Sequence, residues 1–201
     1  KKYNEKGEID PFLSYMNIHF ATGDSNPELI FINNNCNYAE ADQNMAPHGY
    51  GDGNGAYGAT QNLVDAFFTR NGLPIDKDPS YVAKGYSTED IHYPGTAWTR
   101  SNSKDVKGLI TEAGTPNMYC NREPRFYADI HFPNQRVNYY FDGQDNSAAD
   151  LDDEGYGIVD FWFAGLSGHS HTPGDRNTSG LSPRKNIPLD YKSTGSTDTW
   201  Q

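Results

Sequence analysis

Apolar residues recur at helical spacing in two parts of the chain. Thr60 is a suitable N-cap residue, and four apolar residues follow it on one helical face: Leu63, Val64, Phe67 and Phe68. Because Asn71-Gly72 is a typical helix stop, we expect a helix from Gln61 to Arg70. Similar spacing of Phe12, Tyr15 and Met16 predicts a second short helix over residues 11–20.

Alternating apolar and polar positions follow Pro124 and predict a half-buried strand. One face of this strand would carry Phe126, Ala128, Ile130 and Phe132, and the other Tyr127, Asp129 and His131. Residues 133–135 form a turn signal, and residues 137–141 are again apolar, so we expect a hairpin. Compact apolar runs at residues 28–32 and 158–164 predict a buried strand and a third strand of the hairpin region.

Long polar segments separate these elements. Residues 41–58 and everything after Ser167 are expected to be loop, and residues 79–117 form a polar excursion with one helical turn or more at 104–113. The predicted fold class is therefore mixed α+β and loop-rich, with few short helices and a small antiparallel hairpin. At 201 residues, we expect one domain spanning residues 1–201.

The segment Asn121–Tyr127 places two arginines, a carboxylate and a proline directly before the predicted strand. Pro124 fixes its own φ and keeps Glu123 out of the helical region. Arg122 and Arg125 each bring a planar guanidinium with five donors. We interpret Asn121, Arg122 and Arg125 as a structural corner that pairs carboxylates and caps carbonyls. Direct contact with a ligand is the alternative.

Aromatic side chains dominate the apolar composition. The 27 aromatic residues outnumber the 24 leucines, isoleucines and valines, so the core is expected to be aromatic-rich. A second explanation for the scarce aliphatic residues is that the chain normally packs on another segment. The net charge of −11 argues against a nucleic-acid partner. No run of 18 apolar residues occurs, which argues against a membrane-spanning helix.

Several motifs resemble chemical sites but lack an essential part. Gly53–Gly58 fits G-x-G-x-x-G, yet no strand precedes it as a dinucleotide site requires. The acidic residues from Asp142 onward approach a calcium loop, with Ser147 where glycine is required, so no cofactor is expected beyond a non-standard Ca²⁺ site there. His169 and His171 have no third metal ligand nearby. Cys36 and Cys120 are either bridged or two buried thiols, and their spacing does not decide between these states.

Aromatic residues in polar surroundings point to a hydroxyl-rich ligand. Sugar rings present flat C–H faces that stack on aromatic rings, while short polar side chains bond to their hydroxyls. Rings in Asn-, Asp- and Gly-rich surroundings are Tyr81, Tyr86, Tyr93, Trp98, Tyr139, Tyr140 and Trp162. From loop composition we choose four candidate ligand-binding residues: Trp98, Tyr93, Tyr86 and Asn102. The competing interpretation is that most of these rings belong to the core.

Three segments, in order, resemble the SusD/RagB family of outer-membrane nutrient-binding lipoproteins of Bacteroidetes. They are Thr60–Phe67, Asn71–Ile75 and Asn121–Tyr127. Glu28–Phe31 and Ser179–Leu181 with Arg184-Lys185 resemble flanking parts of the family pattern, although Leu181 stands where an aromatic residue is usual. The resemblance extends from about Glu28 to Ile187. It implies the central-to-C-terminal, non-repeat portion of a longer, mainly α-helical chain, with tetratricopeptide-like helices and a lipidated cysteine before Lys1.

The resemblance also implies a function. Such proteins bind oligosaccharides without catalysis at the surface of the outer membrane and deliver them to a SusC-like TonB-dependent transporter. Membrane attachment would be through a lipid anchor outside this chain. Two alternatives remain open: a peptide-binding RagB-like homologue, and a glycoside hydrolase that uses paired carboxylates. Because ligand residues of the family vary with the substrate, no binding residue is transferred to this chain.

Overall fold

The computed structural model describes residues 1–3, 6–20, 26, 30, 38–47, 53–92, 109–137, 150–151, 157–165, 168, 177 and 179–185. Within these ranges the helices are α1 (Pro11–Phe20), α2 (Tyr38–Met45), α3 (Gln61–Ala66), the 3-10 helix η2 (Asn117–Tyr119) and α4 (Pro124–Asp129). The strands are β1 (Ile91–His92), β2 (Leu109–Thr111), β3 (Ile130–His131), β4 (Arg136–Val137), β5 (Asp150–Leu151), β6 (Gly157–Ile158) and β7 (Ser182–Pro183).

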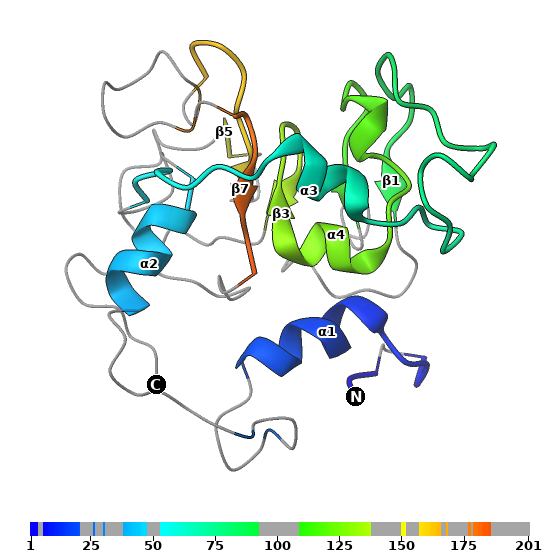
Figure 1. Ribbon diagram of the computed structural model, residues 1–201, viewed down its shortest axis with the longest axis horizontal. Helices are drawn as coiled ribbons and strands as arrows, with labels where there is room; N and C mark the ends of the chain where they lie inside the picture. The colour runs from blue at the N-terminus through cyan, green and yellow to red at the C-terminus, as the bar shows by residue number, and fades with distance from the viewer. Residues whose placement is uncertain are drawn as a thin grey trace.

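The strands form small antiparallel sheets rather than one large sheet. β1 pairs with β2, β3 pairs with β7, and β6 lies between β4 and β5. Short helices, short antiparallel pairs and much irregular backbone confirm the predicted mixed, loop-rich fold class. Figure 1 shows α1 lying beside α4, while β3 and β7 run next to each other to the left of α4.

The core is rich in aromatic residues, as the composition predicted, and several of their rings stack on one another. Phe126 and Phe132 have ring centroids 5.3 Å apart, and Tyr119 stacks on Phe132 at 5.2 Å. Phe12 and Met16 of α1 are buried against this cluster. Stacked and edge-to-face rings stabilise a core beyond the area that they bury, which offsets the small number of aliphatic residues.

The strand predicted over residues 126–132 is wrong in its first half, which is α4. Pro124 occupies the first turn of this helix, where a missing N–H costs nothing and a fixed φ favours the helix. Phe126, Tyr127 and Ala128 are all fully buried. Burial of consecutive residues removes the one-sided pattern that marks a surface helix. Alternation in the sequence was therefore a poor guide here.

The predicted helix after Thr60 exists but ends four residues early. The Thr60 side chain accepts a hydrogen bond from the Leu63 N–H, as expected of an N-cap. At the other end Phe67 is already extended, with φ −71° and ψ 148°. The N–H of Glu123 donates to the carbonyl of Phe68 at 3.0 Å, so pairing with a distant segment replaces the last helical turn.

Other boundaries also differ from the predictions. β3 pairs with β7, and Val137, the one described residue of the predicted return strand 137–141, pairs with Gly157 of β6. α2 lies partly in the expected loop 41–58, β2 replaces the expected helical turns at 109–111, and β7 lies in the expected C-terminal loop. Of residues 28–32 only Ile30 is described, and it is fully exposed rather than buried. The predicted strand 158–164 is reduced to β6 followed by a turn.

Candidate functional site

The corner before α4 is held by the buried side chain of Arg122. Its Nη2 atom donates to the carbonyl oxygen of Phe67 at 2.8 Å, and its Nη1 atom donates to that of Met118 at 2.9 Å. Nη2 also donates to the carbonyl of Val64, inside α3. The guanidinium lies 4.9 Å from the centre of the Phe126 ring. Arg122 is 0 % exposed, so its donors serve the fold and face no ligand.

The other two corner residues lie at the surface. Arg125 binds both carboxylate oxygens of Glu123, with Nε to Oε2 at 2.8 Å and Nη2 to Oε1 at 3.0 Å. Asn121 adopts a positive φ of 53°, and its carbonyl accepts the N–H of Arg70 at 2.7 Å. Asparagine tolerates this left-handed backbone better than most residues. The corner therefore joins α4 to the segment that follows α3.

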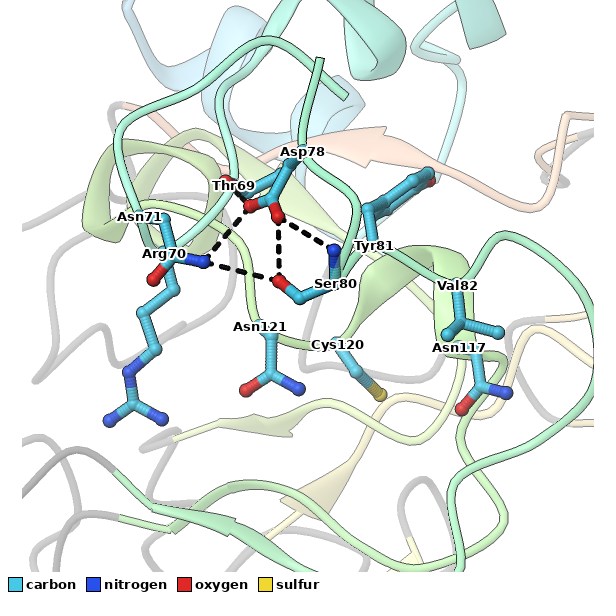
Figure 2. Close-up of a pocket in the computed structure, with 10 residues that line it drawn as sticks. All are labelled: Thr69, Arg70, Asn71, Asp78, Ser80, Tyr81, Val82, Asn117, Cys120 and Asn121. Carbon is cyan, nitrogen blue, oxygen red and sulfur yellow. Dashed lines mark hydrogen bonds between the residues drawn. The ribbon is translucent and has the colours of Figure 1, made fainter. Parts of the chain in front are cut away.

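A cavity of about 340 Å³ opens beside this corner (Figure 2). Its volume falls at the lower end of the range for ligand sites. The lining residues are mostly polar and come from two segments: Thr69, Arg70, Asn71, Asp78, Ser80, Tyr81, Val82, Asn117, Cys120 and Asn121. The cavity thus lies where residues 69–82 face the segment before α4.

Asp78 is the single carboxylate among the lining residues, and its own loop occupies it. Oδ1 accepts the N–H and hydroxyl of Ser80, at 2.9 and 2.6 Å. Oδ2 accepts the Thr69 hydroxyl at 2.5 Å and the Asn71 amide at 3.1 Å, and Figure 2 shows the carboxylate pointing at these partners. These bonds, led by that of the Ser80 hydroxyl, lower the pKa of Asp78 to about 2. Asp78 is therefore an ionised clamp whose four acceptor sites are filled.

The remaining cavity residues are also tied to the fold. The Tyr81 hydroxyl donates to the Met118 carbonyl at 3.5 Å, and the Asn117 amide donates to the Lys84 carbonyl at 2.8 Å. Cys120 is a buried free thiol, and burial raises its pKa. A thiol that stays protonated is a poor nucleophile. The cavity is lined mostly by polar residues, and none of them is poised for acid–base or nucleophilic chemistry.

A second surface brings together two aromatic residues that are far apart in the sequence. Tyr86 is 62 % exposed and Trp162 is 39 % exposed. Their ring centroids are 6.4 Å apart, and the rings are tilted by 48°. The indole Nε1 of Trp162 donates to Oδ1 of Asn134 at 3.1 Å. Exposed rings beside a short amide match the chemistry that we expected of a sugar-binding surface.

The ring surface and the cavity are neighbours along the backbone. Tyr86 forms a β-bridge with Pro116, and the next residue, Asn117, lines the cavity. The N–H of Asn117 donates to the carbonyl of Gly85 at 3.0 Å. Residues 85–87 and 114–117 therefore form a shared strip of backbone that supports both features.

The structure places only some of the residues chosen from the sequence. Tyr86 is exposed at the ring surface, whereas Trp98, Tyr93 and Asn102 lie outside the described residues. The same holds for Tyr139, Tyr140, Cys36 and the acidic loop of residues 142–154, apart from Asp150–Leu151 of β5. The sequence places Trp162 among rings in polar surroundings but does not single it out as a ligand-binding residue. For Asn134 the sequence predicts a turn and no contact with a ligand. Within the described ranges, no cluster of three or more His, Cys, Asp or Glu side chains is arranged to hold a metal ion.

None of the helices among the described residues is both long and apolar enough to span a bilayer. No curated protein sequence matches the chain. A SusD-like protein from Bacteroides fragilis NCTC 9343, known from a crystal structure at 2.70 Å resolution, matches with a TM-score of 0.52 and 24 % sequence identity. The match covers 92 % of this chain and 30 % of that chain, and at this identity it shows the fold alone. The family model described as "SusD family" matches residues 16–201, nearly the whole sequence, and the chain therefore belongs to the SusD family.

Proposed function

We propose that the protein binds an oligosaccharide, without catalysis, at the surface of the bacterial outer membrane. The observation that carries this proposal is the family match over residues 16–201. Proteins of this family are generally glycan-binding surface proteins, and they are generally non-catalytic. The proposal extends to delivery of the glycan to a SusC-like TonB-dependent transporter and to attachment by a lipid anchor outside residues 1–201.

We also propose that residues 1–201 form a single unit equivalent to the central-to-C-terminal, non-repeat portion of the family fold. This chain spans 30 % of the B. fragilis relative, which supports a parent with further structure. Helices of that further structure would pack on the apolar residues that α3 and its neighbours expose, among them Leu63, Phe68 and Leu73.

The geometry of the two surface features supports binding more than hydrolysis. A glycoside hydrolase needs a carboxylic acid that is protonated at working pH, paired with a second carboxyl group about 5–9.5 Å away. The cavity offers one carboxylate, Asp78, and its pKa of about 2 keeps it ionised. The exposed Tyr86 and Trp162 rings instead offer apolar faces next to an amide.

Calorimetric titration of the full-length protein tests the proposal. The probes are maltoheptaose, xylohexaose, cellohexaose and mannohexaose, together with a mixture of unfolded tryptic peptides. We expect binding of at least one glycan and no release of new reducing ends during prolonged incubation. Binding of peptides alone would favour the peptide-binding alternative, and release of reducing ends would favour the hydrolase.

A further inference from the structure

We infer that Tyr86 and Trp162 form a two-ring platform that stacks against a neutral sugar ring, with Asn134 fixing the indole. This inference rests on the proposed glycan-binding function and assigns it to particular residues. It is carried by the accessibility of the two rings, by the way the backbone holds each of them, and by the charge of the segments that carry them.

The mutual orientation of the rings leaves their faces available. Two rings stacked in parallel would cover one face of each other, but these planes meet at 48° with centroids 6.4 Å apart. Tyr86 and Trp162 keep 62 % and 39 % of their surface exposed. Phe163, the neighbour of Trp162, is 82 % exposed. Exposed aromatic residues from two distant segments in contact with each other form an apolar surface that a ligand can cover.

Trp162 is fixed before any ligand arrives. Its indole N–H donates to Asn134 Oδ1 at 3.1 Å, its backbone N–H donates to Asp160 Oδ1 at 3.3 Å, and its carbonyl accepts the N–H of Gly165 at 2.8 Å. Asn134 is itself held by a bond from its N–H to the carbonyl of Val159 at 2.9 Å. Because the polar edge of the indole is already bonded, what it offers to a ligand is its apolar face.

Tyr86 is fixed by its backbone. On one side the N–H of Ser87 donates to the carbonyl of Thr115 at 2.8 Å, and on the other the N–H of Asn117 donates to the carbonyl of Gly85 at 3.0 Å. A tyrosine has only two side-chain torsions to restrict, so binding orders it at low entropic cost. The indole of Trp162 is therefore preorganised and the ring of Tyr86 is ordered at low cost, which favours affinity for a weakly interacting ligand such as a sugar.

The charges of the segments that carry the rings favour a neutral ligand. Asp160 lies two residues before Trp162, Asp90 receives the N–H of Ala113 at 2.8 Å, and Glu112 precedes the turn that pairs with Ser87. In the described segments 84–90, 112–117 and 159–163, Lys84 is the one cation against the carboxylates of Glu89, Asp90, Glu112 and Asp160, in a chain of net charge −11. A negative local potential disfavours anionic glycans such as uronates and sulfated sugars.

The test is calorimetric titration of the full-length protein and its variants with the four neutral glycans named above and with hexagalacturonate. The variants are Tyr86→Ala, Trp162→Ala and Trp162→Phe. Tyr57→Ala is the matched control, because Tyr57 is 47 % exposed and has no part in the ring pair. Near-ultraviolet circular dichroism checks that each variant is folded. Trp162→Phe and Tyr86→Ala keep the test decisive if Trp162→Ala does not fold.

We expect each alanine variant to bind a neutral glycan about tenfold more weakly, or worse, than the wild type. Trp162→Phe retains a ring and should stay within about threefold, as should Tyr57→Ala. Wild-type binding with unchanged affinity in Tyr86→Ala and Trp162→Ala would overturn the platform and leave the proposed function standing. Preferential binding of hexagalacturonate would overturn the neutral-ligand assignment. Absence of any glycan binding by the wild type would instead refute the proposed function, and the platform with it.

Discussion

Arg122 donates a hydrogen bond of 2.8 Å to the carbonyl oxygen of Phe67, which lies 55 residues earlier in the chain. The carbonyls at the end of a helix have no partners within the helix and carry partial negative charge. In this protein the buried guanidinium of Arg122 donates hydrogen bonds to the carbonyls at the end of α3. The corner that precedes α4 and the end of α3 are therefore a single structural unit, although the sequence separates them widely.

Replacing Arg122 with methionine should destabilise the protein strongly. The change keeps much of the side-chain volume but removes the guanidinium donors from the carbonyls of Val64, Phe67 and Met118. The Phe67 carbonyl loses its bond to Arg122, while the Val64 and Met118 carbonyls keep only the weaker bonds from the Phe67 N–H and the Tyr81 hydroxyl, at 3.3 and 3.5 Å. Because each buried, unsatisfied group costs about 1–3 kcal/mol, we expect a loss of about 3 kcal/mol or more in the free energy of unfolding. Urea denaturation followed by circular dichroism measures it.

Arg125→Met provides the control for this prediction. Arg125 is exposed, and its pairing with Glu123 is a surface ion pair, 2.7 Å between Nη2 and Oε2. Such pairs contribute about 0–1 kcal/mol, so the free energy of unfolding of Arg125→Met should be close to that of the wild type. Equal losses in the two variants would show that Arg122 has no special role at the end of α3.

Replacing Asp78 with asparagine should loosen the loop of residues 69–80. The amide nitrogen of asparagine would face donors that now bind a carboxylate oxygen, so two of the four bonds are lost. We expect faster amide hydrogen exchange in this loop at pH 7, measured by mass spectrometry. Asp76→Asn, which only removes an exposed pair with Lys77, should leave the exchange unchanged.

The same carboxylate predicts a pH dependence for this loop. The folded pKa of Asp78 is about 2, below the unfolded value near 3.9. The stability that the ionised Asp78 carboxylate gives to the loop is therefore fully present above about pH 4 and is lost as the pH falls towards 2. As the pH falls from 4 to 2, the amide exchange rate of the loop, divided by the intrinsic rate at each pH, should rise in the wild type and much less in Asp78→Asn. If the loop exchanged at the same rate in the wild type and in Asp78→Asn, both at pH 3 and at pH 7, the Asp78 carboxylate would not hold the loop together.

Tyr15 should stabilise the contact between α1 and α4. Its hydroxyl donates to Asp129 Oδ2 at 2.9 Å, and burial together with Asp129 raises the pKa of Tyr15 to about 12. Tyr15→Phe leaves the Asp129 carboxylate short of a donor and should cost about 1–2 kcal/mol at pH 7. The stabilisation from a raised pKa is present below about pH 10 and is lost as the pH rises through 12. The stability gap between wild type and Tyr15→Phe should therefore narrow from pH 9 to pH 11.5 in guanidinium titrations.

His131 should make the fold sensitive to mild acid. It is fully buried, with Nδ1 2.9 Å from Oε1 of Gln135, and burial, aided by the charge of Arg184, lowers its pKa well below 6.5. The unfolded chain takes up a proton below about pH 6.5 that the folded state refuses, so stability falls as the pH drops, by at most about 1.4 kcal/mol per pH unit. His131→Gln should lose less stability than the wild type between pH 7 and pH 5 in urea titrations. Parallel losses would assign the acid sensitivity to other groups, such as His19, whose pKa burial also lowers.

Local chemistry in the sequence predicted some features well. Thr60 begins α3 because a hydroxyl at that position can accept the Leu63 N–H without help from any distant residue. Residues 11–20 form the predicted helix α1. The excess of aromatic over aliphatic residues predicted an aromatic-rich core, in which the rings of Phe126, Phe132 and Tyr119 stack. These features depend on neighbouring residues or on composition, which a sequence states directly.

Other features were decided only by tertiary contacts. α4 replaced a predicted strand because burial of Phe126, Tyr127 and Ala128 together erases the one-sided pattern that periodicity detects. α3 ends at Ala66 because the Asn121–Tyr127 corner pairs with the backbone that would have continued it. Contacts between distant segments also bring Tyr86 and Trp162 together, because the turns that carry the two rings belong to separate parts of the chain. The sequence by itself determined the N-cap at Thr60, the aromatic-rich core and the family resemblance, because local propensity and composition encode them. Only the tertiary structure decided where elements end and which side chains meet, because those outcomes depend on hydrogen bonds and packing between segments far apart in the chain.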